Sequence, residues 1–278
     1  LWTRERIPAS LDGGYGSVSV ADGRAYVIVS WQDGFNGATE PQDVIVCMEE
    51  ESGKTLWMTG FPGFKSDHCA GSTPCIAGNK IFAFGSQRLY CLDAKTGRGL
   101  WQSEVTGKQI SSSPLFVDNM VFALSDALRA YDPDGGALAD PHNPGGPRKP
   151  RLLWEQDLAA GGPSFEGVEH TSYNSSPAVW RKDGQTYIIT CGDKLTCVDA
   201  QTGIVKWQAP GPGGASATPA ISGDYVVINY GLGRGTYAYH MSPEKAEQLW
   251  RISKSDRGST PVILDDYVYA YGAGSYSC

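Results

Sequence analysis

The 278-residue sequence lacks several patterns that assign a chain to a common functional class. Its 23 Lys and Arg are outnumbered by 30 Asp and Glu, and no basic cluster offsets the net charge of −7, which argues against a nucleic-acid partner. No apolar run is long enough to span a bilayer, so we expect no transmembrane segment. No signal peptide is present and the chain opens on Leu1, so we expect a processed or trimmed product.

Short catalytic motifs are also missing. The sequence has no nucleophile elbow, phosphate-binding loop, zinc-hydrolase motif or recognisable triad. His68, Cys69 and Cys75 resemble a metal cluster, but their spacing matches no zinc pattern, and plain packing is the simpler interpretation. We therefore predict no catalytic residue, metal ligand or cofactor site from local motifs.

The seven cysteines are an odd number, so at least one has no partner within the chain. Cys47, Cys91 and Cys197 stand at equivalent positions of a repeat, and Cys278 has a comparable context. Since a repeat architecture holds equivalent positions apart, we expect these four to be small buried residues rather than disulfide partners. The cysteine pattern therefore does not distinguish an oxidising from a reducing compartment.

That repeat is the strongest positive feature of the sequence. Residues 91–101, 197–207 and 47–57 each start with Cys, carry an acidic residue two positions on, have Gly four before the end and finish on Trp. A strand, a tight turn and a second strand need this pattern. The carboxylate accepts a backbone N–H at the turn, and the Gly takes the left-handed conformation that closes it. The Trp then has a large apolar face to bury.

A second marker of two small residues and a proline recurs in phase with the Trp residues. Consecutive Trp residues lie 43 to 55 residues apart, near the period of a four-stranded propeller blade. We assign a structural docking role to Trp2, Trp57, Trp101, Trp154, Trp207 and Trp250. The markers are Ser72-Thr73-Pro74, Ser112-Ser113-Pro114, Ser175-Ser176-Pro177, Ala217-Thr218-Pro219 and Ser259-Thr260-Pro261. Proline is tolerable there because the strand it starts is the inner edge of a blade.

The sequence thus predicts an all-β fold, a single-domain β-propeller of four-stranded antiparallel blades. Six blades are visible, at approximately 11–57, 70–101, 111–154, 173–207, 215–250 and 258–278 plus 1–8. Either the N-terminal strand closes a ring of six, or the chain is part of a seven- or eight-bladed ring. An open arc leaves sheet faces uncovered and should not be stable alone.

Two insertions and one irregular blade modify the repeat. Residues 30–43 widen a turn of the first blade, where Trp31 and Phe35 either form a partner-binding rim or fold back over the blade. Residues 133–150 extend the third blade and are predicted to be irregular. In the fifth blade, Ser242 is expected to start a single helical turn, and His240 to take the strand position usually held by Cys.

The Asp-Ala-x-Thr-Gly-x-x-x-Trp pattern at 93–101 and 199–207 resembles the tryptophan-docking motif of the pyrroloquinoline-quinone-like propeller repeat family. The resemblance covers nearly the whole chain and implies a periplasmic or extracellular location. The family includes quinone- and calcium-dependent alcohol and sugar dehydrogenases, and it includes cofactor-free scaffolds. The dehydrogenase branch typically places a disulfide between adjacent cysteines against the quinone; no two cysteines are adjacent here, and no haem motif follows.

Candidate ligand residues lie just ahead of the small-small-Pro markers, where propeller loops gather around one mouth of the central channel. They are Lys65, Asp67, His68, Lys108, Gln109, Glu169, His170, Tyr173, Asn174, Asp256 and Arg257. Such a mixed-charge funnel suits a small polar ligand, although loop ends are polar in any propeller. One hypothesis is that Glu169, Asn174 and Asp256 supply oxygen ligands to calcium, with Arg257 or Lys65 near a bound anion.

The leading hypothesis is a non-catalytic binding or scaffold propeller that recognises a protein partner or a small polar ligand through these loops. The alternative is a dehydrogenase that uses pyrroloquinoline quinone with calcium. Recognition of a saccharide or peptide at the funnel is a third possibility. The sequence names neither a substrate nor a partner.

Overall fold

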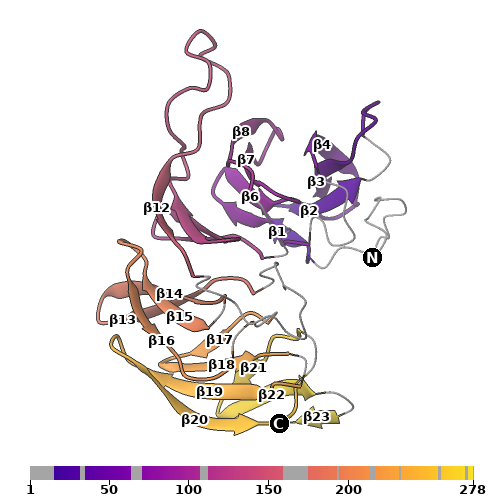
Figure 1. The fold of residues 1–278 in the computed structure, drawn as a ribbon. Helices are drawn as coiled ribbons and strands as arrows, with labels where there is room; N and C mark the ends of the chain where they lie inside the picture. The colour runs from indigo at the N-terminus through magenta and orange to yellow at the C-terminus, as the bar shows by residue number, and fades with distance from the viewer. Residues whose placement is uncertain are drawn as a thin grey trace. The chain divides into compact units, whose positions relative to one another are not determined.

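A computed structural model describes residues 16–31, 35–63, 71–106, 112–158, 175–192, 194–212, 214, 217–231, 233–255, 258–272 and 275–277. These residues are organised as antiparallel sheets joined by turns and loops (Figure 1). Within this described part of the chain, no helix has the length and hydropathy needed to cross a membrane.

Five four-stranded sheets and one three-stranded sheet are formed by the described residues. The first three sheets contain β1 (Ser19–Ala21), β2 (Arg24–Trp31), β3 (Gln42–Glu49), β4 (Thr55–Pro62); β5 (Cys75–Ala77), β6 (Lys80–Phe84), β7 (Leu89–Asp93), β8 (Gly99–Gln102); and β9 (Leu115–Val117), β10 (Met120–Leu124), β11 (Leu128–Tyr131), β12 (Leu152–Gln156). The other three contain β13 (Ala178–Lys182), β14 (Gln185–Cys191), β15 (Leu195–Asp199), β16 (Val205–Gln208); β17 (Ala220–Ser222), β18 (Tyr225–Asn229), β19 (Thr236–Met241), β20 (Ala246–Ile252); and β21 (Val262–Leu264), β22 (Tyr267–Gly272), β23 (Ser275–Ser277). The strands of each sheet are neighbours in chain order, which confirms the predicted antiparallel blades.

The chain divides into two compact units. One consists of Leu1–Ser125 and Ala130–Leu153, and the other of Asp126–Arg129 and Trp154–Cys278. The first two sheets lie in the first unit, and the last three lie in the second. The predicted blade boundaries and the predicted single domain stay predictions. Closure of the ring by the N-terminal strand also stays a prediction, because residues 1–15 lie outside the described part.

The repeated turn has the local chemistry that the sequence indicates. Asp93 Oδ1 accepts hydrogen bonds from the Lys95 N–H (3.1 Å), the Thr96 N–H (2.8 Å) and the Thr96 hydroxyl (2.7 Å). Gly97 has φ of 73°, in the left-handed region that glycine occupies without strain. Because these bonds favour the ionised carboxylate, led by the Thr96 hydroxyl, the pKa of Asp93 lies below its usual range.

At the outer edge, the terminal Trp of one sheet contacts the turn of the next sheet. The indole N–H of Trp57 donates to the Ala94 carbonyl at 3.2 Å, and a Cβ on Gly97 would stand 2.5 Å from the Trp57 ring. Gly97 is therefore required twice, for its φ and for the close approach of the indole. Equivalent donations join Trp101 to Pro133 (3.0 Å), Trp154 to Ala200 (3.0 Å) and Trp207 to Ser242 (2.8 Å).

At the inner edge, the middle hydroxyl of four small-small-Pro markers accepts a hydrogen bond from the preceding sheet. The Ser17 N–H donates to Thr73 Oγ1 at 2.9 Å, and the Thr73 N–H donates to Ser113 Oγ at 2.8 Å. In the second unit the Thr218 N–H donates to Thr260 Oγ1 at 3.2 Å, and the Ser176 N–H donates to Thr218 Oγ1 at the same distance. The marker thus supplies a hydroxyl acceptor for an edge-strand N–H, as well as a small side chain.

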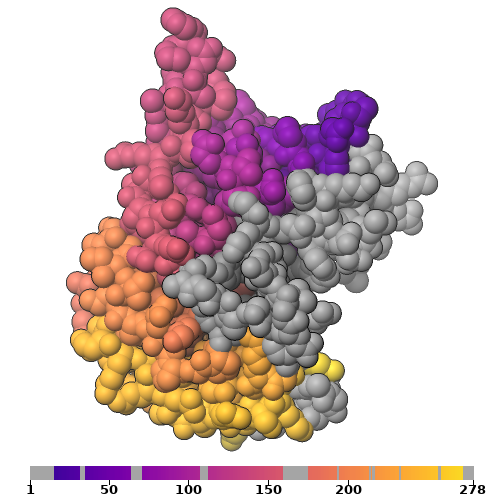
Figure 2. Space-filling model, viewed as in Figure 1, coloured from indigo at the N-terminus to yellow at the C-terminus, as the bar shows by residue number. Residues whose placement is uncertain are grey.

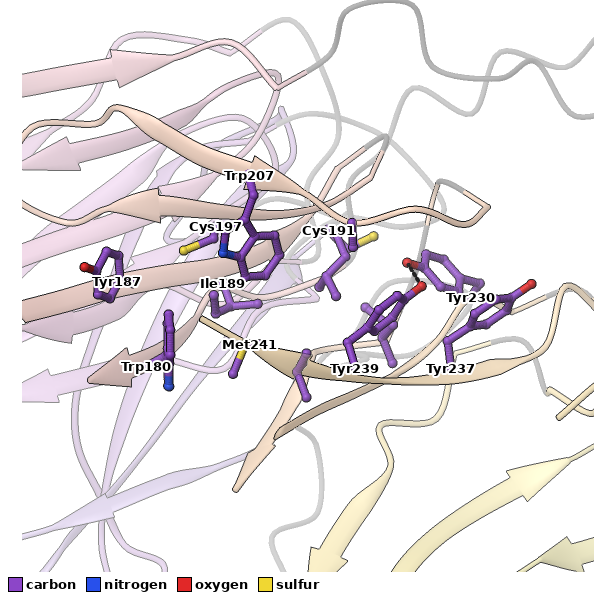
Figure 3. Packing of buried hydrophobic residues seen from close by; sticks show 14 residues of the cluster. Trp180, Tyr187, Ile189, Cys191, Cys197, Trp207, Tyr230, Tyr237, Tyr239 and Met241 are labelled. Atoms are coloured by element: carbon purple, nitrogen blue, oxygen red, sulfur yellow. Dashed lines mark hydrogen bonds between the residues drawn. The ribbon is translucent and has the colours of Figure 1, made fainter. Parts of the chain in front are cut away.

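Between these edges, the two central strands of each of the first five sheets are largely buried, whereas Tyr267, Tyr269 and Tyr271 of β22 in the sixth sheet are exposed. Phe82, Cys91 and Val121 are inaccessible to solvent, and the Trp101 ring contacts Phe82 at a centroid distance of 5.9 Å. In the second unit, Trp180, Trp207 and the tyrosines of β19 form another such cluster (Figure 3). All five described cysteines are free thiols, and Cys47, Cys91 and Cys197 are buried, as expected.

The insertion between β2 and β3 folds back over its own sheet. Phe35 packs against Trp31 with ring centroids 5.1 Å apart. A Cβ on Gly60, in β4, would stand 2.6 Å from the Phe35 ring, so the ring fills the space that a side chain at residue 60 would take. Of the two alternatives for these aromatics, the structure thus has the folded-back one.

Three details of the sequence interpretation are wrong. Residues 133–150 form a hydrogen-bonded hairpin, with Leu138 bridged to Arg148, rather than an irregular loop. Ser242 starts a tight turn and no helix, because its N–H donates to the Lys245 carbonyl (2.9 Å) and returns the chain into β20. The paired strands extend further before this turn than in the fourth sheet, so Ala238, and not His240, pairs with Trp250 as Cys197 pairs with Trp207.

Candidate functional site

The channel-mouth residues that the sequence proposes all lie outside the described residues. They are Lys65, Asp67, His68, Lys108, Gln109, Glu169, His170, Tyr173, Asn174, Asp256 and Arg257. Trp2 also lies outside them. The structure does describe the end of each sheet from which those loops start. At this end, the loop between the second and third strands of a sheet contacts the end of its fourth strand.

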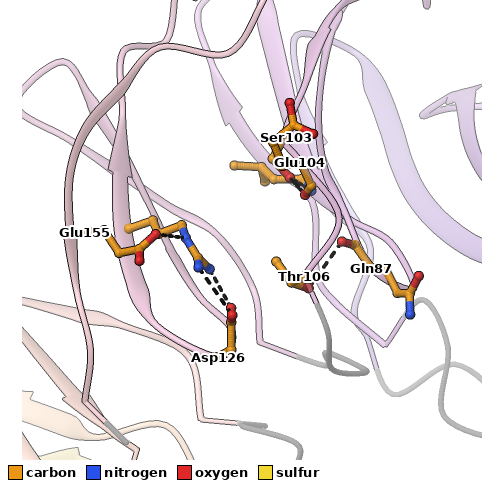
Figure 4. A network of polar contacts seen from close by, with 8 residues as sticks. Gln87, Ser103, Glu104, Thr106, Asp126 and Glu155 are labelled. Carbon is orange, nitrogen blue, oxygen red and sulfur yellow. Dashed lines mark hydrogen bonds and ion pairs between the residues drawn. The ribbon is translucent and has the colours of Figure 1, made fainter.

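In the second sheet, this end is held together by backbone and serine hydrogen bonds (Figure 4). The Ser103 N–H donates to the Leu89 carbonyl (2.8 Å), and Ser103 Oγ accepts the Leu89 N–H (2.9 Å). The Thr106 N–H reaches the Gln87 carbonyl at 2.9 Å, and Arg88 donates to the Ser103 carbonyl at 2.7 Å. The outgoing chain is therefore fixed as far as residue 106.

An arginine–carboxylate group stands at the same end of the third sheet, within the second unit (Figure 4). Arg129 on β11 contacts Asp126 at 2.5 Å and Glu155 of β12 at 2.6 Å. The arginine side chain is largely buried, whereas the two carboxylates are about a third to a half exposed, at 36% and 46%. The guanidinium thus ties a loop to the end of the outer strand, and solvent screening keeps the strength of each pair modest.

A fully buried carboxylate lies between the first and second sheets. Asp43, at the start of β3, accepts three hydrogen bonds on Oδ2: the Ser86 N–H (2.8 Å), the Ser86 hydroxyl (2.9 Å) and the Tyr90 hydroxyl (3.0 Å). Its Oδ1 has no partner among the described residues. A Cβ on Gly85 would stand 2.2 Å from Oδ2, so only glycine leaves room for the carboxylate.

Burial raises the pKa of Asp43 to about 6, although the hydrogen bonds from Ser86 and Tyr90 oppose the shift. The pKa of Tyr90 is raised by its own burial and then by the neighbouring Asp43 carboxylate. Sequence reasoning missed this site, because an acid at the start of a strand also fits a solvated edge. The available signal was the position of Asp43 directly before the apolar run Val44–Met48.

The corresponding place between the fourth and fifth sheets contains phenols instead. The Tyr239 hydroxyl donates to the Pro210 carbonyl at 2.8 Å and lies 3.3 Å from the Tyr230 hydroxyl (Figure 3). Burial raises the pKa of Tyr239 to about 12 and also raises that of Tyr230. Both hydroxyls are therefore protonated and neutral throughout the physiological range.

The described residues do not offer a calcium site. Calcium takes six to eight oxygen ligands, usually including several carboxylates. Asp43 is the buried carboxylate of the described part; one of its oxygens is occupied by three donors, and its neighbours Ser86 and Tyr90 supply no second carboxylate. No group of three His, Cys, Asp or Glu side chains suited to a metal ion occurs among the described residues.

Comparison with known protein families gives one match. The model of the family described as outer membrane protein assembly factor BamB matches residues 40–139 and 146–275. The two segments together span most of the chain and cover the repeats from which the resemblance to quinone-like propellers was drawn. No curated protein matches the sequence.

Solved structures give matches at low sequence identity. BamB from Moraxella catarrhalis is 17% identical with a TM-score of 0.65, and the alignment covers 94% of this chain and 69% of that one. The computationally designed Ika8 protein is 13% identical with a TM-score of 0.58, covering 92% and 67%. A europium-containing methanol dehydrogenase is 14% identical with a TM-score of 0.55, covering 85% and 50%. At these identities the likeness shows the fold alone, and the predicted β-propeller fold is confirmed.

Proposed function

Because the chain belongs to the family described as outer membrane protein assembly factor BamB, we propose that it is a non-catalytic β-propeller scaffold that holds a protein partner. The observation that carries the proposal is the family match across both segments of the chain. The family is described as an assembly factor, and we extend that role to this chain by analogy. A location outside the cytoplasm, periplasmic or extracellular, is part of the same proposal.

The structural role of the repeated residues supports this function. The Asp, Thr, Gly and Trp of the repeat close turns and join consecutive sheets, as at Asp93, Thr96 and Trp57. Side chains engaged in this way are not free for chemistry. We therefore propose that recognition uses the loops ahead of the small-small-Pro markers, where the repeats differ in sequence and where Lys65, His170 and Arg257 lie.

The alternative, a quinone-dependent dehydrogenase, has less support from the chain's own residues. The described carboxylates do not assemble calcium ligands around a common point, and the sequence has no adjacent cysteines. The fold likeness to a methanol dehydrogenase carries no argument about activity at 14% identity. A funnel that binds a small polar ligand is the remaining variant of the binding hypothesis.

Crosslinking of the intact protein in its own cells, followed by identification of the captured partner, tests the proposal. The wild type is expected to capture a defined partner, and a variant with His68→Ala, His170→Ala and Arg257→Ala is expected to lose it. A variant with Lys54→Ala, Lys95→Ala and Lys206→Ala, which changes exposed cations away from these loops, is the control and should retain capture.

A second experiment distinguishes the scaffold hypothesis from the dehydrogenase hypothesis. The purified protein is supplied with pyrroloquinoline quinone and calcium and assayed for dye reduction against alcohols and sugars. Robust turnover would overturn the scaffold proposal. Capture that is unchanged in the loop variant would overturn the assignment of binding to these loops.

A further inference from the structure

The hairpin formed by residues 132–151 is a built element of the first unit (Figure 1). Its two arms are joined by backbone hydrogen bonds from Gly136 to Lys149 (2.8 Å), from Lys149 back to Ala137 (2.8 Å) and from Ala139 to Pro147 (2.9 Å). Its tip is closed by the Gly146 N–H, which donates to the Asn143 carbonyl at 2.9 Å. A loop that served only to connect β11 to β12 would need no such ladder.

The returning arm of the hairpin is fixed to the outer edge strand of the second sheet. The Arg148 N–H donates to the Leu100 carbonyl of β8 at 2.6 Å, and the guanidinium of Arg98 donates to the Gly145 carbonyl at 2.7 Å. Edge strands expose unpaired backbone groups, and covering them prevents unwanted pairing. The hairpin is therefore held in one position relative to β8. In the space-filling view it is the pink segment that projects at the top (Figure 2).

The charged groups of this surface are only partly paired. Two of its acids are already paired, Asp134 with Lys80 at 2.7 Å and Asp132 with Arg151 at 3.1 Å. Three exposed cations, Arg98, Arg148 and Lys149, form no ion pair within 4 Å among the described residues. Arg98 and Arg148 act only at longer range, where they help to lower the pKa of Asp93 and of Asp134. The guanidinium groups of Arg98 and Arg148 donate to backbone carbonyls, so both are held in place while keeping their charge.

The positions of the charges indicate which kind of anion fits. Residues 140–145, which form the tip, include Asp140 and His142 but no Lys or Arg, so a flat anionic membrane would meet an acid first. Arg148 and Lys149 are consecutive residues of the returning arm, and Arg98 lies beside it in the turn between β7 and β8. An extended peptide advances by about 3.3 Å per residue, so several of its carboxylates can reach cations placed in this way. Guanidinium groups also bind carboxylates in a two-pronged geometry.

We propose that the hairpin binds an acidic, extended segment of a protein partner through Arg98, Arg148 and Lys149. This surface goes beyond the loops of the proposed function, because antiparallel pairing puts the β11–β12 connection at the opposite end of the sheet from the β10–β11 loop. The protein's net charge of −7 sharpens the contrast, since acidic partners are repelled elsewhere and attracted here.

Binding of a fluorescent oligoglutamate peptide to the intact protein, followed by anisotropy at low and high salt, tests the inference. Arg98→Gln, Arg148→Gln and Lys149→Gln together are expected to weaken binding by about tenfold or more. The control triple Lys54→Gln, Lys194→Gln and Lys206→Gln, with the same change in net charge, should stay within about twofold. Equal weakening in both triples, or no change in the first, would overturn the proposal.

Two further variants separate charge from folding of the hairpin. Arg98→Lys with Arg148→Lys keeps both charges but loses the two-pronged guanidinium geometry, so it should bind more weakly than the wild type and more tightly than the triple Gln variant. Lys149→Glu, whose side chain carries no hydrogen bond of the hairpin, should weaken binding by about tenfold while the Gly136 amide stays protected from hydrogen exchange. Vesicles rich in phosphatidylglycerol are the competing probe, and binding to them in the absence of peptide binding would overturn the assignment to a protein segment. These results do not depend on the loop variants, so failure here and failure of the proposed function are distinguishable.

Discussion

Two buried polar contacts occupy corresponding places between consecutive sheets, one in each unit, and their chemistry differs. In the first unit, Asp43 of one sheet accepts hydrogen bonds from Ser86 and Tyr90 of the next. In the second unit, Tyr239 donates to the Pro210 carbonyl of the preceding sheet. The first contact contains an ionisable group with a pKa near the working range, and the second contains phenols that stay neutral.

The difference shows that the repeat determines the positions at which consecutive sheets contact each other. It does not determine which side chains form the contact. Ionisation of Asp43 is disfavoured by burial, so its pKa in the folded state, about 6, lies above the ordinary value of 3.8. Its stabilising contribution is therefore fully present below about pH 4 and is lost as the pH rises through about 6. The phenolic contact has no counterpart to this loss. The following predictions use that contrast, from the largest effect to the smallest.

Removing the Trp contacts should show that the two units share their main source of stability. Trp101→Ala and Trp207→Ala each delete a largely buried indole and its hydrogen bond, and each is expected to cost about 3–5 kcal/mol of unfolding free energy. Trp250→Ala is the control, because this indole is 38% exposed, and it should cost about 1 kcal/mol. Urea unfolding measures all three. A large cost in one unit only would contradict an equal role.

Neutralising Asp43 should remove the pH dependence that distinguishes the first unit. Asp43→Asn keeps the shape of the protonated side chain, so its stability should match the wild type near pH 4. At pH 8 it should exceed the wild type by about 3 kcal/mol, the equivalent of about two pKa units. Urea unfolding at both pH values gives the comparison. A difference between the two proteins that stays constant with pH would show that Asp43 is ionised at little cost.

Removing one phenol should cost less and should not depend on pH. Tyr239→Phe loses the hydrogen bond to the Pro210 carbonyl, with an expected cost of about 1 kcal/mol at both pH 5 and pH 8, by urea unfolding. Tyr225→Phe, at a hydroxyl that is well exposed, is the control and should change stability by less than about 0.5 kcal/mol. Loss of stability at one pH alone would place a titrating group in this contact as well.

The inner-edge hydroxyls should have the smallest effects and still differ between units. Thr218→Val removes the acceptor of a partly buried hydrogen bond, at an expected cost of about 1 kcal/mol. Thr73→Val removes the acceptor of an exposed one, where water can replace it, at about 0.5 kcal/mol. Thr218→Ser retains the hydroxyl and should recover most of the loss in thermal unfolding. Equal losses in Thr218→Val and Thr218→Ser would assign the effect to the methyl group.

Much of the architecture could be predicted because its determinants are local. Asp93 and Gly97 close a turn with groups no more than four residues apart, and the same chemistry recurs at Asp199 and Gly203. Patterns of that length can be recognised in a single sequence. The second role of Gly97, its contact with Trp57, could not be predicted, since the two residues come from different sheets.

The candidate site shows where sequence reasoning ended. Loop residues such as His68 and Arg257 were chosen because they precede the markers, and they stay predictions, since they lie outside the described residues. Asp43 was not chosen at all, because its burial depends on Gly85, Ser86 and Tyr90 of the neighbouring sheet. The hairpin at 132–151 was mistaken for irregular chain, because its Pro and Gly content conceals a ladder that only pairing reveals.

The sequence by itself determined the four-stranded antiparallel sheets, the turns between their strands and the use of Trp, Gly and Ser or Thr at fixed positions. These follow from conformational preferences and hydrogen bonds within one repeat. Only the tertiary structure decided that Asp43 is buried with a raised pKa, that Tyr239 holds the equivalent contact elsewhere, and that Arg98 and Arg148 fix a cationic hairpin. Each of these properties depends on a second sheet or strand that the residue contacts. Burial and charge balance arise from such contacts and not from the residue alone.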